Sequence, residues 1–177
     1  MVYPNSMGDK TVKGLEPKKL NGKGLNIMIV HTRWNNKVVD ALVQGAVDEL
    51  AALGVASITK ADVPGAFELP LAVQHQLSIK DGQKYRYDAV IAIGVLIKGS
   101  TMHFEYIAEA TANGLMRVGI LLNSGLDQKR PVIFGVLTCL TDQQALQRAG
   151  IGHCAHNHGI DWAQAAVEMS LLTKAPN

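Results

Sequence analysis

Residues 87–97, YDAVIAIGVLI, form the feature that most restricts the possible folds of this chain, because they are apolar at nearly every position. A strand with one face in water alternates apolar and polar residues, whereas a strand covered on both faces is apolar throughout. Residues 25–30 (LNIMIV) and 131–140 (PVIFGVLTCL) are further apolar strand candidates, and residues 56–63 (ASITKADV) are a fourth. We therefore predict a sheet with helices on both faces, which is the arrangement of parallel α/β proteins.

Helical patterns follow each of these strands. Residues 36–53 repeat apolar pairs every four residues, which predicts one apolar helical stripe that ends at Gly54. Further helices are expected in residues 64–79, from about 101 to 118, in 141–150, where Thr141 and Gln144 match a capping box, and in 156–174. Strands that alternate with helices are joined by right-handed crossovers. The predicted fold class is a three-layer α/β/α sandwich with a parallel sheet of four or five strands.

The composition indicates one globular domain with a tail. The chain has 177 residues, of which 47% are apolar and 18% charged. Residues 1–24 contain five lysines with several glycines and prolines, and we expect a flexible tail there, followed by a single domain over 25–177. The net charge is +2, but the surplus lies in the tail and leaves the domain at −1. We therefore expect no binding to nucleic acid.

Several features of the sequence favour the cytoplasm. No apolar run approaches the roughly 20 residues of a membrane span, so we expect no membrane association. The N-terminus lacks the apolar core of a secretory signal. Cys139 and Cys154 match no paired-cysteine pattern, which fits a reducing compartment.

Unusual residues follow three of the predicted strands. The segments are HTRWN (31–35), VPGAFE (63–68) and KGSTMH (98–103). Ligands of open parallel sheets bind outside the carboxyl ends of the strands. We therefore expect the three segments to converge on one edge of the sheet.

The third segment combines features of an anion site and of an acid/base group. Gly99, Ser100 and Thr101 precede a helix, whose first amides lack intrahelical partners and attract anions. The alternative is that Ser100 is an ordinary N-cap. His103 lies in the first turn of that helix, where the dipole favours the neutral imidazole that accepts a proton. The alternative for His103 is a partly buried structural histidine.

Other candidates have two interpretations each. Trp34 and Phe67 could stack on a planar ligand or could pack against the start of a helix. Glu68 could accept hydrogen bonds from a polyhydroxyl group or could complement the helix dipole. Arg148 could clamp a phosphate with its forked guanidinium or could be a favourable cation at a helix C-terminus.

The run HCAHNH raises the question of a metal site. His153, Cys154, His156 and His158 are potential ligands, but they lack the paired spacing of a zinc site and a partner cluster elsewhere. We therefore predict no metal site, and interpret His158 as a loop histidine that contacts a ligand.

Six motifs together resemble the lumazine synthase (6,7-dimethyl-8-ribityllumazine synthase) family. They are HTRWN, VPGAFELP, GVLIKGSTMHFEYIAEA, PVIFGVLT, QALQRAG and HNHGIDWAQAAVEM, and the resemblance covers about residues 25–173. It implies a flavodoxin-like α/β/α sandwich, in agreement with the pattern of strands and helices. It also implies condensation of 5-amino-6-(D-ribitylamino)uracil with 3,4-dihydroxy-2-butanone 4-phosphate, the penultimate step of riboflavin biosynthesis, without any cofactor or metal.

The resemblance further implies a role for each candidate residue. In the uracil site, Trp34 would stack on the ring and Glu68 would accept from the ribityl hydroxyls. The other residues of that site would be Ala66, Phe67, Val95, Leu96 and Ile97. At the phosphate, Gly99, Ser100 and Thr101 would bind the anion beside His103, which would transfer protons. Phe134 and Arg148 would come from an adjacent subunit, with His158 also near the site.

The resemblance implies a homo-oligomer, and we favour a pentamer over a 60-subunit shell. The connection AGIGHCAHNHG (149–159) is long, and in the family an insertion there accompanies free pentamers. Two alternatives are a carrier that binds flavin or lumazine without turnover and a purely structural shell protein. Neither would need His103, Arg148 and the phosphate-binding segment together.

Overall fold

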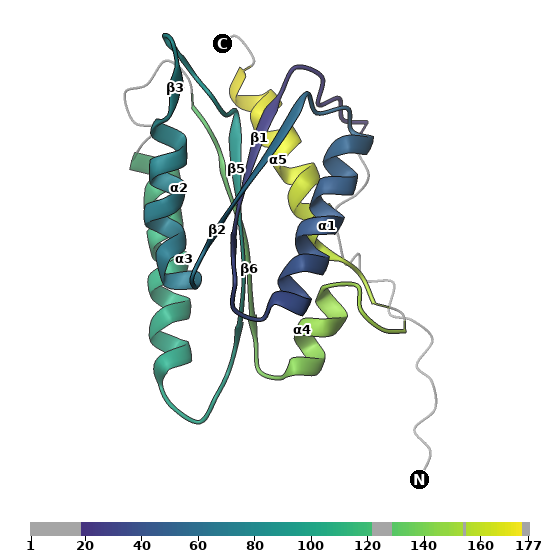
Figure 1. Ribbon diagram of the computed structural model, residues 1–177, viewed down its shortest axis with the longest axis vertical. Coiled ribbons are helices and arrows are strands. Elements are labelled where there is room, and N and C mark those ends of the chain that lie inside the picture. Colours follow the sequence, from purple (N-terminus) through teal and green to yellow (C-terminus); the bar gives the residue numbers. More distant parts are fainter. Residues whose placement is uncertain (1–18, 122–128, 154, 175–177) are drawn as a thin grey trace.

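The main sheet of the protein contains four parallel strands. The computed structural model describes residues 19–121, 129–153 and 155–174 (Figure 1). The strands are β1 (Asn26–Thr32), β2 (Ser57–Val63), β5 (Ala89–Ile97) and β6 (Val132–Cys139). Their order, β2-β1-β5-β6, is that of a flavodoxin-like sheet. The prediction of a parallel α/β fold is confirmed.

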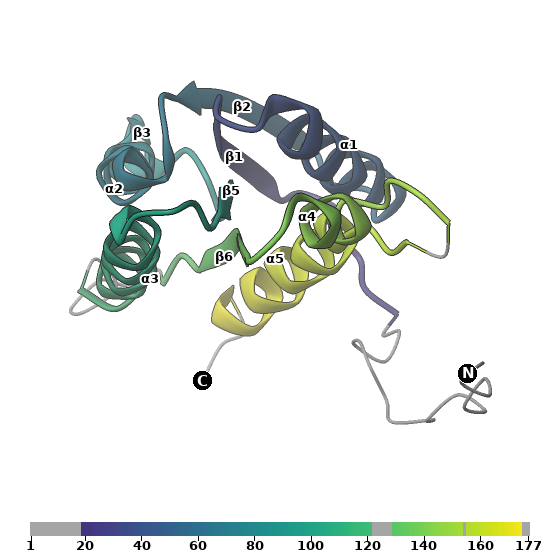
Figure 2. The ribbon, with the colours of Figure 1, turned by 90° about the horizontal axis from the view of Figure 1, so that it is seen from below.

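Helices cover both faces of this sheet. They are α1 (Asn36–Ala52), α2 (Leu69–Ser78), α3 (His103–Leu121), α4 (Asp142–Arg148) and α5 (His158–Lys174), with a 3-10 turn η1 (Ala66–Glu68) before α2. α1, α4 and α5 lie on one face, and α2 and α3 lie on the other (Figure 2). The three layers agree with the predicted sandwich.

The apolar run that opened the sequence analysis is the centre of the sheet. β5 lies between β1 and β6, and its residues from Ala89 to Val95 are all buried. Ile91 and Ile93 pack in the core under α1 and α5, while Val90 and Ala92 pack in the core under α2 and α3. Because both faces of β5 are covered, every position on the strand is apolar.

Two predicted helix boundaries have a clear physical basis. α1 ends at Ala52, and Gly54 adopts a left-handed φ of 75°, which glycine reaches without steric cost. At the start of α4, the Thr141 hydroxyl accepts a hydrogen bond from the Gln144 amide at 3.3 Å. The Gln144 side chain accepts from the Leu140 amide instead of the Thr141 amide, so the predicted capping box is only half formed.

One element is absent from the sequence prediction. β3 (Lys80–Asp81) and β4 (Lys84–Tyr85) form a short antiparallel hairpin between α2 and β5. Strands of two residues are too short for any periodicity to show. The Asp81-Gly82 dipeptide, common in hairpin turns, was the available signal.

Part of the segment predicted as a tail packs against the domain. Leu20 lies against the core, and the Gly22 amide donates to the Leu53 carbonyl at 2.7 Å. Residues 1–18 of that segment lie outside the described residues.

α1 and α5 approach each other closely where α5 begins. A Cβ atom on Gly159 would collide with the Leu42 carbonyl oxygen and would lie 2.9 Å from the Ala46 amide nitrogen. Both atoms belong to the backbone of α1, which cannot move aside as a flexible side chain could. The packing of these helices therefore requires glycine at this position.

We expect Gly159→Ala to lower the free energy of unfolding by about 1–3 kcal/mol, because overpacking displaces a helix. Denaturant titration followed by circular dichroism measures the change. Gly99→Ala is the control, since a Cβ there meets no atom within 4 Å, and its free energy of unfolding should change by less than about 0.5 kcal/mol. Equal stability of the two variants would contradict the close approach of the helices.

Candidate active site

The three segments singled out in the sequence all follow strands at one edge of the sheet. They lie at the lower end of the sheet in Figure 1, where β1, β2 and β5 end. The Arg33 guanidinium and the Asp62 carboxylate form an ion pair of 2.5 Å beside the ends of β1 and β2. This hydrogen bond lowers the pKa of Asp62. The expected convergence is therefore present in the fold.

Trp34 is held in an exposed position by its neighbour Asn35. Asn35 has a left-handed backbone, with φ 59°, and its side-chain amide donates to the Val95 carbonyl at 2.9 Å. This bond ties the loop after β1 to the end of β5. Trp34 is 73% exposed, and its Cδ1 lies 3.5 Å from where a Cβ on Gly65 would be. A side chain that packs against the start of a helix would be buried, so this exposure fits a stacking surface better.

The turn before α2 lies beside this indole. The Gly65 amide donates to Oε2 of Glu68 at 2.9 Å, and the Ala66 carbonyl accepts from the Thr111 hydroxyl of α3 at 3.2 Å. The first bond fixes the turn through one of its own side chains, and the second ties the turn to α3. Phe67 is left 61% exposed at the tip of the turn.

The end of β5 lies between these two loops. Val95 is buried, whereas Leu96 and Ile97 are half-buried. The Lys98 amide donates to the Cys139 carbonyl at 2.9 Å and so joins the end of β5 to the end of β6. Backbone groups in this stretch are therefore close to both Asn35 and the loop that follows.

The loop at residues 99–102 is exposed and leads into α3. The helix begins at His103, whose amide lies 3.5 Å from the Thr101 hydroxyl. Ser100 lies in the loop, three residues before the helix, so it does not match the alternative of an ordinary N-cap. Gly99, Ser100, Thr101 and His103 are all exposed at the start of the helix, which is where the sequence predicts an anion site.

An ion pair spans this loop. Lys98 and Glu105 are in contact through their side chains, so the residue before the loop is joined to the first turn of α3. The hydrogen bond from Lys98 lowers the pKa of the Glu105 carboxyl. The loop is thus held at both ends while its own polar groups remain exposed.

Phe134, Arg148 and His158 lie apart from these loops within one chain. Phe134 lies on the edge strand β6, where it pairs with Ala92 of β5, and it is 44% exposed beside α3. Arg148 and His158 lie on α4 and α5, on the opposite face from α3 (Figure 2). Among the described residues, no hydrogen bond or ion pair joins either of them to Trp34 or His103.

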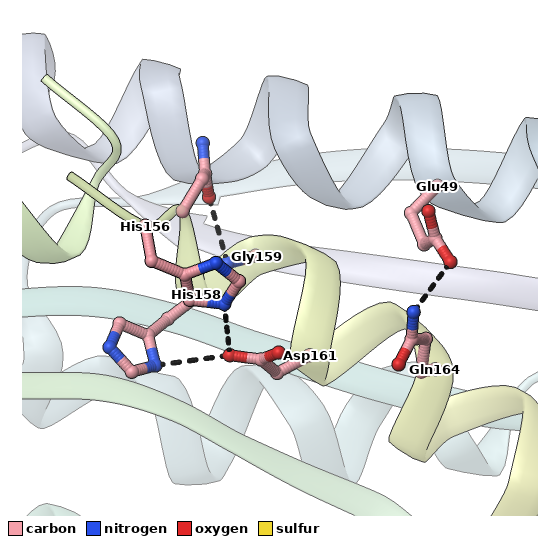
Figure 3. Close-up of polar contacts among 7 residues, drawn as sticks. Glu49, His156, His158, Gly159, Asp161 and Gln164 are labelled. Atoms are coloured by element: carbon pink, nitrogen blue, oxygen red, sulfur yellow. Dashed lines mark hydrogen bonds and ion pairs between the residues drawn. The ribbon is translucent and has the colours of Figure 1, made fainter. Parts of the chain in front are cut away.

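His158 and Arg148 are close enough to interact with one another. Burial lowers the pKa of the His158 imidazole, Asp161 partly opposes this, and the Arg148 charge adds to the lowering. Nδ1 of His158 lies 3.2 Å from the Asp161 carboxylate (Figure 3). The Arg148 guanidinium and the His158 imidazole therefore belong to the same corner of the domain, where α4 ends and α5 begins.

Sequence reasoning did not single out Asn35, Thr111 or Asp161 as members of the candidate site. Asn35 stands before a predicted helix, which is a usable signal for a cap but not for its bond to Val95. Thr111 and Asp161 act through contacts that depend on the packing of helices, and no sequence pattern reports them.

The fold and these loops define a parallel α/β protein with a small-molecule site at the carboxyl edge of its sheet. The sequence model of the family described as 6,7-dimethyl-8-ribityllumazine synthase matches residues 24–174. The chain belongs to this family, which confirms the predicted resemblance and supports an enzyme of riboflavin biosynthesis.

Curated relatives carry the same name. A 6,7-dimethyl-8-ribityllumazine synthase of Schizosaccharomyces pombe is 50% identical over 163 residues, covering 90% of this chain and 95% of the relative. One from Pyricularia oryzae is 43% identical, with 90% and 93% covered, and one from Aquifex aeolicus is 42% identical, with 89% and 95% covered. None of these matches favours a carrier without turnover. In the part of the chain that is described, no helix is long and apolar enough to cross a membrane.

The Lys98–Glu105 pair predicts a pH dependence of stability. Because the pKa of Glu105 is lower in the folded chain than in the unfolded one, the stabilisation is complete above the unfolded pKa. It is lost as the pH falls through the folded pKa. We expect Glu105→Gln to melt below the wild type at neutral pH and the two to converge in acid, as measured by thermal denaturation.

Glu109→Gln is the matched control for this prediction. Glu109 is exposed on the same helix and has no ion pair among the described residues. Its replacement should leave the melting temperature close to that of the wild type at both pH values. A gap between wild type and Glu105→Gln that persists in acid would contradict the role of the ion pair.

Proposed function

We propose that this chain catalyses the condensation of 5-amino-6-(D-ribitylamino)uracil with 3,4-dihydroxy-2-butanone 4-phosphate to give 6,7-dimethyl-8-ribityllumazine, phosphate and water. The observation that carries the proposal is the convergence of three exposed loops on one edge of the sheet in a member of this family. One loop offers an aromatic face, one offers a carboxylate, and one offers hydroxyls and an imidazole. These are the groups that an aromatic amine and a phosphate ester require.

The first substrate lies between Trp34 and the turn that contains Ala66, Phe67 and Glu68. The exposed indole stacks on the pyrimidine ring. The ribityl chain lies along the turn, where Glu68 accepts from its hydroxyls. The ring edge is read by the end of β5, residues 95–97, whose carbonyls and amides are held in place by the Asn35 and Lys98 bonds.

The phosphate of the second substrate binds at Gly99, Ser100 and Thr101. The free amides at the start of α3 and the two hydroxyls supply donors for its oxygens. Phosphate leaves during the reaction, and donors that stabilise the departing anion lower the barrier. His103, at the first position of the helix, transfers protons while the carbinolamine loses water and the ring closes.

The site is shared between adjacent subunits of a homo-oligomer. Phe134 and Arg148 serve the site of a neighbour, Phe134 beside the ring and Arg148 at the phosphate, with His158 close to Arg148. Exposed apolar side chains support such an assembly, since Tyr106, Met116 and Ile120 of α3 lie uncovered. Another subunit would cover them.

The assembly is a pentamer, and it works in the cytoplasm. The connection between α4 and α5, residues 149–157, is long, which supports a free pentamer over a 60-subunit shell, because in the family an insertion there accompanies free pentamers. The domain comprises residues 25–177, preceded by a tail. Both substrates are small molecules, and the proposal includes neither a nucleic-acid partner nor association with a membrane.

We expect His103→Ala to lower kcat by about 10²-fold, because general acid–base catalysis is lost while two reactive substrates are still held together.

Arg148→Ala should mainly raise the KM for the butanone phosphate, with kcat/KM falling about 10- to 100-fold from the loss of a charged hydrogen bond. The measurement is lumazine absorbance with the spontaneous background subtracted. Wild-type protein that gives no acceleration over background would refute the proposed function.

Mixed oligomers test whether the site is shared. When His103→Ala and Arg148→Ala chains are co-expressed in equal amounts, about one quarter of the sites combine an intact His103 with an intact Arg148 from the neighbour. When the butanone phosphate is well below its KM, activity should therefore exceed that of either variant alone.

The matched control pairs two residues from the same half of the site. Co-expression of His103→Ala with Trp34→Ala cannot restore an intact site, because both residues come from one chain. Recovery in this control, or its absence in the test pair, would contradict a site shared between subunits.

A further inference from the structure

Two histidines of the HCAHNH run, for which the sequence predicts no metal site, meet Asp161 at the start of α5. Oδ2 of Asp161 lies 2.8 Å from Nε2 of His156 and 3.2 Å from Nδ1 of His158 (Figure 3). These three atoms all lie within 4.8 Å of one another. In the part of the chain that is described, this is the only group of three His, Cys, Asp or Glu residues with such geometry.

The backbone that carries these ligands is fixed by Asn157. Its side-chain amide donates to the Ala41 carbonyl of α1 at 2.8 Å, and its side-chain oxygen accepts from the Gly159 amide at 2.8 Å. Asn157 also forms a β-bridge with Ala149. His156 and His158 therefore flank a residue anchored in three directions, so the cluster is assembled before any ligand arrives.

We propose that His156, His158 and Asp161 form a binding site for a divalent transition-metal ion of the zinc class. Two imidazoles and one carboxylate are a common donor set for zinc, and imidazole nitrogen excludes magnesium and calcium as preferred occupants. Three protein ligands leave a fourth position open to water or to a substrate oxygen.

The present contacts are compatible with metal binding. Each histidine faces the carboxylate with a ring nitrogen whose N–H group is placed to donate a hydrogen bond to it. A neutral imidazole can move that proton to its other nitrogen and offer the lone pair to a cation. His156 is exposed, with 57% of its side chain accessible, so an ion can reach the site from solvent.

Charge limits the affinity. The amino end of α5 and the Arg148 guanidinium, whose charge is felt at His158, both oppose a cation. Asp161 supplies the compensating negative charge. We therefore expect binding in the micromolar range and not the much tighter binding of a structural zinc site.

Metal binding has a consequence that rests on the proposed function. In the proposed site, His158 lies near the substrate phosphate together with Arg148. A metal ion that coordinates His158 would occupy its imidazole nitrogen and add positive charge beside the phosphate. Zinc should then inhibit turnover, and removal of zinc by a chelator should restore it.

Direct binding decides the proposal independently of activity. Isothermal titration of the chelator-treated full chain with zinc chloride, and visible absorption with cobalt chloride as the spectroscopic probe, should both show saturable binding of one ion per chain. His156→Ala and Asp161→Asn should abolish it. His75→Ala, which removes an exposed histidine from α2, should leave it unchanged.

Each possible result is informative. No saturable binding, or binding retained in folded His156→Ala, overturns the site. His156 lies outside the proposed catalytic machinery. Inhibition by zinc of the wild type but not of His156→Ala therefore supports inhibition through this site. Zinc binding without inhibition of turnover overturns the predicted inhibition but supports the metal site itself. A wild type that binds zinc but shows no turnover refutes the proposed function alone.

Discussion

The burial of β5 on both faces is the constraint on which the rest of the structure depends. Because its residues contribute alternately to two cores, helices must lie on each side of the sheet. Helical crossovers join the strands, and β1 and β6 run parallel to β5. Parallel strands end at the same edge. The loops after β1, β2 and β5 are therefore brought together by the packing of apolar residues, before any functional side chain is considered.

The loops of the candidate site combine a fixed backbone with exposed side chains. Asn35 holds the end of β5 through Val95, Thr111 holds the turn at Ala66, and the Lys98–Glu105 pair spans the loop before α3. Trp34 and Phe67 remain largely exposed as a result. Such preorganisation lowers the entropy lost when two small substrates are held in a reactive arrangement.

A single chain separates its candidate residues into two groups. The loops with exposed aromatic and hydroxyl side chains lie at the ends of β1, β2 and β5, whereas Arg148, His158 and Asp161 form a corner around the start of α5. The second corner has its own anchor in Asn157. Assembly of subunits would allow one chain to present this corner to the loops of the next, and the corner has the donors to bind a metal as well as an anion.

The sequence by itself determined the class of fold, the positions of the main strands and helices within a few residues, and the family. It could do so because periodicity and strand-end motifs such as KGSTMH are local properties of the chain. It missed the β3–β4 hairpin, whose strands are too short to show a period. Only the tertiary structure decided which distant residues meet: Asn35 with Val95, Thr111 with Ala66, Gly159 with the backbone of α1, and Asp161 with two histidines. These contacts depend on how helices pack across the sheet, and that packing is a property of the whole core which no single stretch of sequence encodes.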